Sequence, residues 1–172
     1  IGALAARNPR YSKLFGPVSI SKEYHALSKN LIVSYLRENR LDTDFSSYVN
    51  PRNPFKMRRI KGVELKSIYP MLRDIKDVSP LISDIEKDGK GVPVLLRQYI
   101  NLNAMIVSFN VDKGFSDVLD GLIVVDLTTT DQKLLKRFMG KDGVKRFMEY
   151  HADTMNAGTS KRGEEQKIPV NV

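Results

Sequence analysis

The chain has 172 residues, and 41% of them are hydrophobic, which is enough for one compact domain with its own core. It contains no cysteine and two histidines, so disulfides, thiolate metal sites and cysteine nucleophiles are excluded, and a multi-histidine zinc site is disfavoured. None of its apolar runs approaches the roughly 18 residues that a membrane-spanning helix needs. We therefore predict one domain without a metal site.

The formal net charge of +8 is unevenly distributed along the chain. Residues 1–62 contain 12 Lys and Arg against 4 Asp and Glu, whereas residues 63–172 contain 16 of each. A one-sided positive field favours an acidic partner, which is nucleic acid, an anionic membrane surface or an acidic protein. A solvated basic face without a dedicated partner is an equally good interpretation of such a cluster.

The first expected elements are the end of a helix, a strand and a second helix. Residues 1–6 are small and apolar, and Pro9 ends their pattern, because the residue before a proline disfavours the helical conformation. A strand is expected at 14–21, with Ser21 as the N-cap of a helix at 22–39. The start lacks Met and the regions of a signal peptide, so we interpret the chain as a fragment, a proteolysed product or a domain of a longer protein.

The middle of the chain is expected to contain an irregular segment followed by helices. Residues 42–62 hold two prolines and a basic run, which predicts an irregular basic connection. Residues 63–77 have helical spacing that Pro70 interrupts. Ser79-Pro80 resembles an N-cap with proline at the first helical position, which predicts that a short helix begins there.

The last part of the chain predicts two strands between helices. The expected elements are a helix at 93–102 with Leu95 and Leu96 facing the core, strands at 105–111 and 121–127, helices at 131–139 and 142–151 on either side of Gly140, and a mobile polar tail at 152–172. The strand at 121–127 is apolar on both faces, which places it in the middle of a sheet. This order predicts an α/β or α+β fold in which helices flank a mixed sheet.

Several local motifs have both a chemical and a structural interpretation. The DGKG sequence at 88–91 offers amides and a lysine to a phosphate, but it lacks Walker-A spacing, and a plain turn explains it better. The aspartates around the two later strands match no metal-binding loop. His25 lies near serines in the sequence without forming a triad, and we interpret it as a helix-start or surface residue. Tyr24 and Tyr35 are candidate acids only if a ligand cleft opens beside them.

Three stretches of the chain resemble one known family. They are ARNPRYSKLFGPVSIS at 6–21, PRNPF at 51–55, and GKGVPVLLRQYINL at 89–102 with FNVD at 109–112 and LDGLIVVDL at 119–127. Together they resemble the carboxyl-terminal part of the bacterial hemolysin-like acyltransferases, which are GNAT-type N-acyltransferases related to the enzyme that makes lyso-ornithine lipid. In many of these proteins a glycerolipid-acyltransferase-type domain is joined upstream.

The resemblance implies that residues 1–151 are the carboxyl-terminal portion of a GNAT-like domain, followed by the tail at 152–172. Residues 1–8 would be the end of the central helix, and the glycine-rich turn that binds the donor at the start of that helix would lie outside this chain. We therefore expect this polypeptide alone to be inactive. An unpaired sheet edge would run beside 14–21, covered by another copy of the chain, by a loop or by the tail.

The chemistry implied by the resemblance is transfer of a fatty acyl group from a thioester to an amine by direct attack. This chemistry needs no serine or cysteine nucleophile and no covalently bound cofactor, and its donor is acyl carrier protein or CoA loaded with the acyl group. Tyr35 falls near the tyrosine that serves many GNAT enzymes as the acid for the departing thiolate. Tyr35 is accordingly the candidate catalytic residue.

Seven residues are candidates for binding the substrate or partner. They are Ser19, Ser21, Arg52, Lys56, Arg58, Arg59 and Lys61. The five basic members are expected to be exposed on one side of the domain, as a docking face for acidic acyl carrier protein or for an anionic membrane surface. We expect a cytoplasmic protein, with peripheral attachment at the inner membrane face as an option.

A rival hypothesis is a basic binding module without catalysis. Nucleic acid is disfavoured as its partner, because beyond Phe55 the basic cluster has no interleaved aromatic platform. A third hypothesis is a purely structural half-domain that awaits its other half, and it is compatible with the resemblance. Self-association through the exposed sheet edge would be one way to complete such a half-domain.

Overall fold

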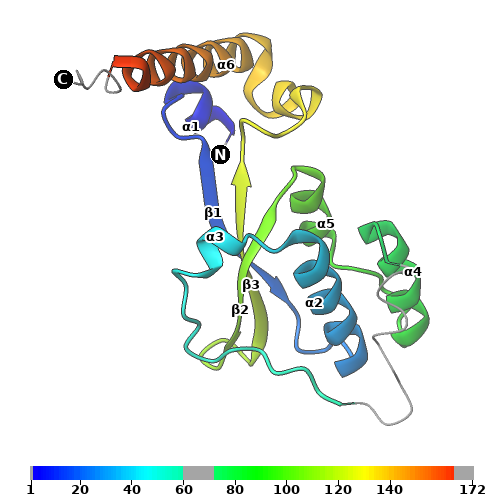
Figure 1. Ribbon diagram of the computed structural model, residues 1–172. Coiled ribbons are helices and arrows are strands. Elements are labelled where there is room, and N and C mark those ends of the chain that lie inside the picture. Colours follow the sequence, from blue (N-terminus) through cyan, green and yellow to red (C-terminus); the bar gives the residue numbers. More distant parts are fainter. Residues whose placement is uncertain (1, 60–71, 165–172) are drawn as a thin grey trace, which may run out of the picture. The chain divides into compact units, whose positions relative to one another are not determined.

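The computed structural model describes residues 2–59 and 72–164 (Figure 1). Its elements in chain order are α1 (Gly2–Arg7), β1 (Lys13–Ile20), α2 (Ala26–Arg40), α3 (Thr43–Ser46), α4 (Ile75–Ile85), α5 (Val94–Asn101), β2 (Met105–Asp112), β3 (Val118–Asp126) and α6 (Gln132–Glu164). The predicted α/β class, with helices flanking a sheet, is confirmed and is consistent with half of a GNAT-like fold. Residues 14–125 form one compact unit, and the two ends of the chain form another.

The three described strands form one sheet in the order β1-β3-β2, as the sequence predicted. β2 and β3 pair antiparallel, with Phe109 opposite Gly121. β1 also runs antiparallel to β3, and the side chain of Ser19 donates to that of Asp120 across this pair. Leu41 forms an isolated parallel bridge with Ile106 at the outer edge of β2. The central position of β3 explains why its apolar residues are buried on both faces.

Helix α2 lies between the sheet and α4 (Figure 1), and it buries Leu31, Ile32 and Leu36. The predicted N-cap is wrong, because the helix begins at Ala26 and its N-cap is His25. The Nδ1 atom of His25 accepts a hydrogen bond from the backbone N–H of Leu27 at 3.2 Å, which confirms His25 as a helix-start residue. The preceding residues form a turn instead.

Helix α4 begins before the predicted Ser79-Pro80 start, so that prediction is wrong. The helix begins at Ile75, and Asp74 is its N-cap. In this capping box the Asp74 side chain accepts the backbone N–H of Asp77, and the Asp77 side chain accepts the backbone N–H of Asp74. Pro80 lies inside the helix and lacks the N–H that would bond to the carbonyl of Lys76. Pro80 and Lys76 are both exposed, so water can satisfy that carbonyl. Most of the predicted helical stretch at 63–77 lies outside the described residues.

The unit formed by the two chain ends packs α1 against α6. Gly140 interrupts α6 with a φ of 73° and a ψ of 166°, which confirms two helical pieces on either side of this residue. Gly143 lies against α1 so closely that an added Cβ would be 3.0 Å from the Cβ of Ala6. The side chain of His151 also hydrogen-bonds the carbonyl oxygen of Pro9 at 2.8 Å. The second piece of α6 continues through His151 to Glu164, into the range where the sequence predicted a tail.

Candidate anion-binding groove

The basic connection between α3 and α4 begins as an extended segment at residues 52–58, which we call the strap. It follows the outer edge of β2: the N–H of Val111 donates to the carbonyl oxygen of Asn53 at 2.8 Å, and Pro54 forms a bridge with Asn110. At its other end, the Nδ2 of Asn30 on α2 donates to the carbonyl oxygen of Arg58 at 2.7 Å. The strap therefore spans from the sheet edge to the first turns of α2.

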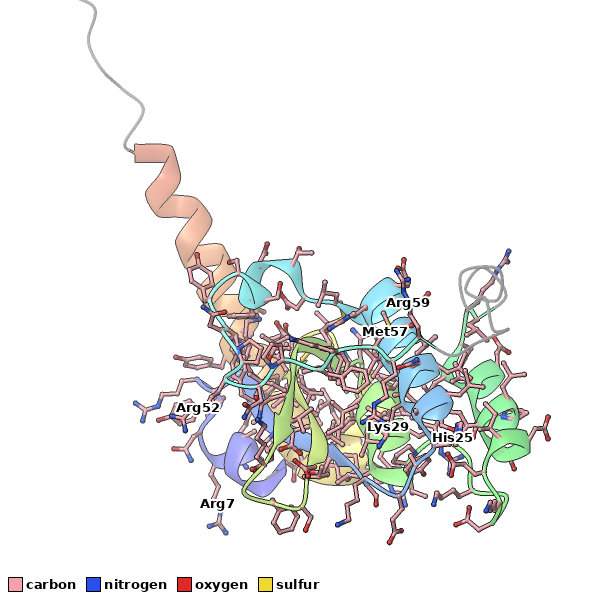
Figure 2. The ribbon with its side chains drawn as sticks, turned by 90° about the horizontal axis from the view of Figure 1, so that it is seen from below. Arg7, His25, Lys29, Arg52, Met57 and Arg59 are labelled. Atoms are coloured by element: carbon pink, nitrogen blue, oxygen red, sulfur yellow. The ribbon has the colours of Figure 1, made fainter. Side chains whose placement is uncertain are left out.

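A groove of about 1010 Å³ opens between the strap, the start of α2 and the loop that joins β2 to β3. Its charged lining residues are Lys22, Lys29, Arg52, Lys56, Arg58, Lys113 and Asp117. Six cations thus face one carboxylate. Phe55, Met57 and Leu119 add apolar surface to the lining. Figure 2 looks onto this face, with Arg52 and Met57 on the strap and Lys29 on α2.

The structure brings together part of the predicted binding set. Arg52, Lys56 and Arg58 line the groove and are exposed, as expected, and Arg59 is exposed at the end of the strap. Lys61 lies outside the described residues.

The two predicted serines lie outside the groove lining. Ser19 donates to Asp120 at 2.5 Å, and Ser21 accepts a hydrogen bond from the N–H of Glu23 at 3.2 Å. Both hydroxyls therefore take part in local contacts, one across the sheet and the other in the turn before α2.

Sequence reasoning missed three of the groove cations, namely Lys22, Lys29 and Lys113. Lys29 projects from the first turns of α2, and Lys113 follows β2 directly. The available signal was the position of these lysines beside element ends, but only the fold shows that those ends meet the strap. Charge density along the sequence identifies the strap alone.

Lys29 experiences the positive field of the groove. Burial lowers the pKa of its ammonium group, the Arg58 guanidinium lowers it further, and Glu86 opposes them. The Nζ atom donates to the carbonyl oxygen of Lys22 at 3.0 Å. An anion bound near Lys29 and Arg58 would relieve their mutual repulsion.

A cleft opens beside one of the two candidate tyrosines. Tyr24 lines the groove, and its hydroxyl donates to the carbonyl oxygen of Gly91 at 2.8 Å. Tyr35 is 2% exposed and is not among the groove residues. Burial raises the pKa of Tyr35, although a hydrogen bond with Arg40 opposes this, so its hydroxyl stays protonated at neutral pH.

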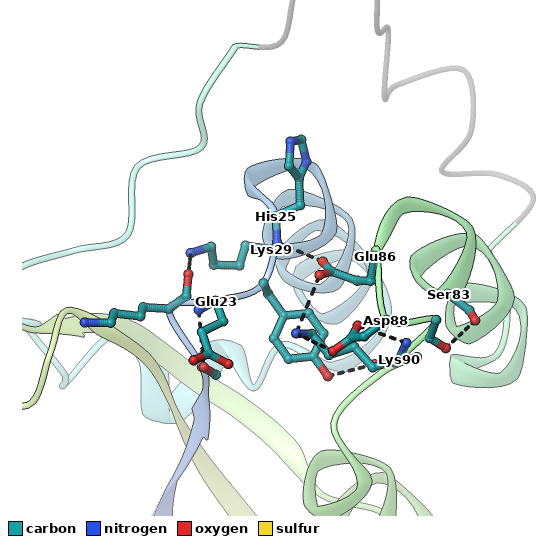
Figure 3. Close-up of polar contacts among 12 residues, drawn as sticks. Glu23, His25, Lys29, Ser83, Glu86, Asp88 and Lys90 are labelled. Carbon is teal, nitrogen blue, oxygen red and sulfur yellow. Dashed lines mark hydrogen bonds and ion pairs between the residues drawn. The ribbon is translucent and has the colours of Figure 1, made fainter.

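The glycine-containing loop at 88–91 is a folded turn whose lysine already has acidic partners (Figure 3). The Nζ of Lys90 lies 3.7 Å from a carboxylate oxygen of Glu86 and 3.2 Å from one of Asp88. Glu86 also accepts the backbone N–H of His25 at 2.8 Å. An added Cβ at Gly91 would lie 2.2 Å from the Oγ of Ser79, so the turn packs closely on α4. These contacts give the loop a structural role and leave Lys90 poorly placed to bind phosphate.

Within the part of the chain that the structure describes, no group of three histidine or acidic side chains is arranged to hold a metal ion. Across the same residues, no helix is both long and apolar enough to cross a membrane.

Two curated proteins are similar to this chain. The glycine N(alpha)-acyltransferase of Bacteroides thetaiotaomicron is 24% identical over 167 residues, which cover 95% of this chain and 47% of the relative. The protein of the same name from Phocaeicola vulgatus is 22% identical over 158 residues, covering 90% of this chain and 46% of the relative. No family model and no solved structure matches. The chain spans about half the length of these relatives, and its similarity to them supports a relationship with acyltransferases.

Proposed function

We propose that this chain is part of an acyltransferase that moves a fatty acyl group from a thioester to the amine of a small acceptor in bacterial lipid synthesis. The single observation that carries the proposal is the similarity of nearly the whole chain to two glycine N(alpha)-acyltransferases. The antiparallel sheet flanked by helices agrees with the half of a GNAT-like fold that this function would use.

In the proposed reaction the neutral amine attacks the thioester carbonyl carbon. The new N–C bond forms, the C–S bond breaks, the nitrogen loses a proton and the departing thiolate gains one. Tyr35 is the residue that we propose for protonating the thiolate, and its protonated hydroxyl supports that role. Tyr35 is 2% exposed and does not line the groove, so this role requires the packing around Tyr35 to open when the thioester binds.

The donor proposed is acyl carrier protein or CoA, each of which is strongly anionic. The exposed cations of the strap, together with Arg59, offer a docking face for such a donor or for an anionic membrane surface. Attraction between exposed charges is screened by salt, so donor binding through this face would weaken as ionic strength rises.

The test is release of free thiol from an acyl-carrier-protein thioester or an acyl-CoA in the presence of glycine or ornithine. Two polypeptides are compared: this chain alone, and a chimera in which it replaces the matched region of the Bacteroides relative. We expect amine-dependent turnover from the chimera and none from the chain alone. A folded chimera without turnover would contradict the proposed function. Turnover by the chain alone would contradict the expectation that the donor site needs residues outside it.

The basic groove favours a second candidate, which is a binding module without catalysis. Filter binding with duplex and single-stranded nucleic acid at moderate salt distinguishes it from the first candidate. Retention of duplex or single-stranded nucleic acid at moderate salt, without amine-dependent turnover by the chimera, would favour the binding module.

A further inference from the structure

We propose that the groove between the strap, the start of α2 and the β2–β3 loop is a binding site for a phosphate ester that also carries an N–H or O–H donor. Both a lipid headgroup and a free phosphate ester have this chemistry. Phosphate binding here is independent of whether the chain takes part in acyl transfer, and it can be measured without a thioester.

The first observation is that the groove cations lack acidic partners. None of the six forms an ion pair with a carboxylate of the described residues. Three lysines elsewhere in the described residues do have acidic partners: Lys13 pairs with Asp126, Lys90 with Glu86 and Asp88, and Lys145 with Glu149. What distinguishes the groove is that six such cations and a single carboxylate line one concave surface, where three elements meet.

A site that combines lysines and arginines is better suited to bind a phosphate than to bind a single carboxylate. An arginine guanidinium offers a planar pair of donors that matches two phosphate oxygens, and lysine ammonium groups neutralise the remaining charge. Arg52 and Arg58 lie on the wall formed by the strap, while Lys22 and Lys29 lie on the wall formed by the start of α2 and the turn before it. A doubly charged anion between the walls would contact both kinds of donor.

The second observation is a buried acceptor without a donor. Asn30 lines the groove and is 1% exposed, and its Nδ2 is bonded to the carbonyl oxygen of Arg58. Its Oδ1 is buried and has no hydrogen-bond partner among the described residues. Such a group is rare in folded proteins, because burial deprives it of water. A ligand with an N–H or O–H group next to its phosphate would supply the missing donor after a small shift of the strap.

The apolar residues near the groove separate the two sources of phosphate. Met57 lines the groove and is 43% exposed, and Phe115, in the loop between β2 and β3, is 69% exposed. Exposed apolar side chains beside cations are typical of surfaces that bind anionic membranes. Phe115 would contribute to binding on a lipid surface and would contribute nothing to binding of a soluble ester.

The experiment is a calorimetric titration of this chain with glycerol 3-phosphate and, separately, with inorganic phosphate. We expect saturable binding of both, tighter for glycerol 3-phosphate because its hydroxyls can donate to Asn30. The double variant Lys29→Gln/Arg58→Gln should weaken binding by about tenfold or more, since it removes two charge-assisted contacts. The matched control Lys133→Gln/Lys136→Gln removes the same charge from exposed positions on α6 and should change affinity less than about twofold.

The groove variants keep the contact that holds the strap, because Asn30 bonds the backbone of Arg58 and not its side chain. Circular dichroism of each variant checks this directly, and the matched pair Lys22→Gln/Lys113→Gln tests the same groove if the first pair is unfolded. Equal weakening by the groove and control pairs would overturn the proposal, because binding would then follow net charge alone. Absence of saturable binding to both the soluble probes and anionic vesicles would also overturn it.

A vesicle arm identifies the source of the phosphate. Sedimentation with phosphatidylcholine vesicles that contain phosphatidylglycerol is compared with sedimentation on phosphatidylcholine alone. Binding to the anionic vesicles that both the groove pair and Phe115→Ser weaken would support the proposal with a lipid headgroup as ligand. Binding of glycerol 3-phosphate that is unaffected by Phe115→Ser, without vesicle binding, would support it with a free ester. Retention of an acidic protein without binding of either phosphate probe would overturn it.

Discussion

The amide of Asn30 joins helix α2 to the carbonyl oxygen of Arg58 across 2.7 Å, and this bond fixes the end of the strap beside the first turns of the helix. Two consequences follow from one contact. The Arg58 guanidinium is held near enough to Lys29 to lower the pKa of that lysine. The strap is also held as one wall of the groove, while its other end is bonded to β2.

Replacing Asn30 with alanine should detach the strap from α2. The substitution removes a hydrogen bond at a buried position, and we expect the free energy of unfolding to fall by about 1–2 kcal/mol. Trypsin should then cut after Arg58 or Arg59 faster than in the parent chain, because the strap opens more often. Denaturant unfolding and timed proteolysis measure the two effects. Unchanged proteolysis would show that the contacts with β2 hold the strap without Asn30.

The matched substitution Ser28→Ala should raise the free energy of unfolding or leave it unchanged, in contrast to Asn30→Ala. Ser28 lies two residues before Asn30 on α2 and is fully buried, and within the described part of the chain its hydroxyl has no hydrogen-bond partner. Alanine removes the unpaired hydroxyl and has a higher helix propensity, so we expect stability to stay constant or to rise by about 0.5–1 kcal/mol. A loss of stability in denaturant unfolding would show that a buried water or another donor pairs with Ser28.

The lowered pKa of Lys29 gives a prediction about pH. Its folded pKa lies below its unfolded pKa, so in the window between the two the unfolded chain binds more protons and stability rises as pH rises. Phosphate binding has the opposite dependence, because it weakens once Lys29 loses its charge. In carbon NMR of labelled lysine, Lys29 should lose its proton at a lower pH than the exposed lysines, and added phosphate should raise the pKa of Lys29. Titration together with the other lysines would contradict the electrostatic account of the groove.

The sequence predicted the parts of the fold that depend on local patterns. Apolar runs predicted the positions of β1, β2 and β3, and Gly140 predicted the break in α6 because its positive φ suits glycine. The core face of α5 was partly wrong: Leu96 and Ile100 are buried, but Leu95 is 56% exposed. Adjacent residues point about 100° apart around a helix, so in so short a helix the apolar pattern fits more than one face, and tertiary packing selects the face of Leu96 and Ile100.

The groove was less predictable than the fold for a physical reason. The strap cations are close together in the sequence, but Lys22, Lys29 and Lys113 join them only because the start of α2 and the β2–β3 loop lie beside the strap. The unpaired oxygen of Asn30 depends on which atoms surround it, and no residue pattern encodes that. Conversely, the DGKG loop had a recognisable composition, but its lysine is paired with Glu86 and Asp88 in the folded chain.

The outer edge of β1 offers a surface for self-association. This strand pairs with β3 on one side, and no strand that the structure describes lies on its other side. Pro17 within β1 agrees with an edge position, because proline cannot donate a ladder hydrogen bond. Phe15 is 54% exposed on the same strand, and its ring meets that of Phe45 edge-on, with 5.2 Å between centroids. An exposed apolar edge is a template for pairing with a second copy of the chain.

We therefore expect this chain to form a weak, concentration-dependent dimer that Phe15→Lys abolishes, since a charge on an edge strand opposes pairing. Tyr48→Lys is the matched control, because Tyr48 is 86% exposed and lies outside the sheet. Sedimentation velocity across a concentration series measures the association. A chain that stays monomeric at every concentration would contradict this prediction. Equal loss of the dimer in both variants would assign it to added charge instead of the β1 edge.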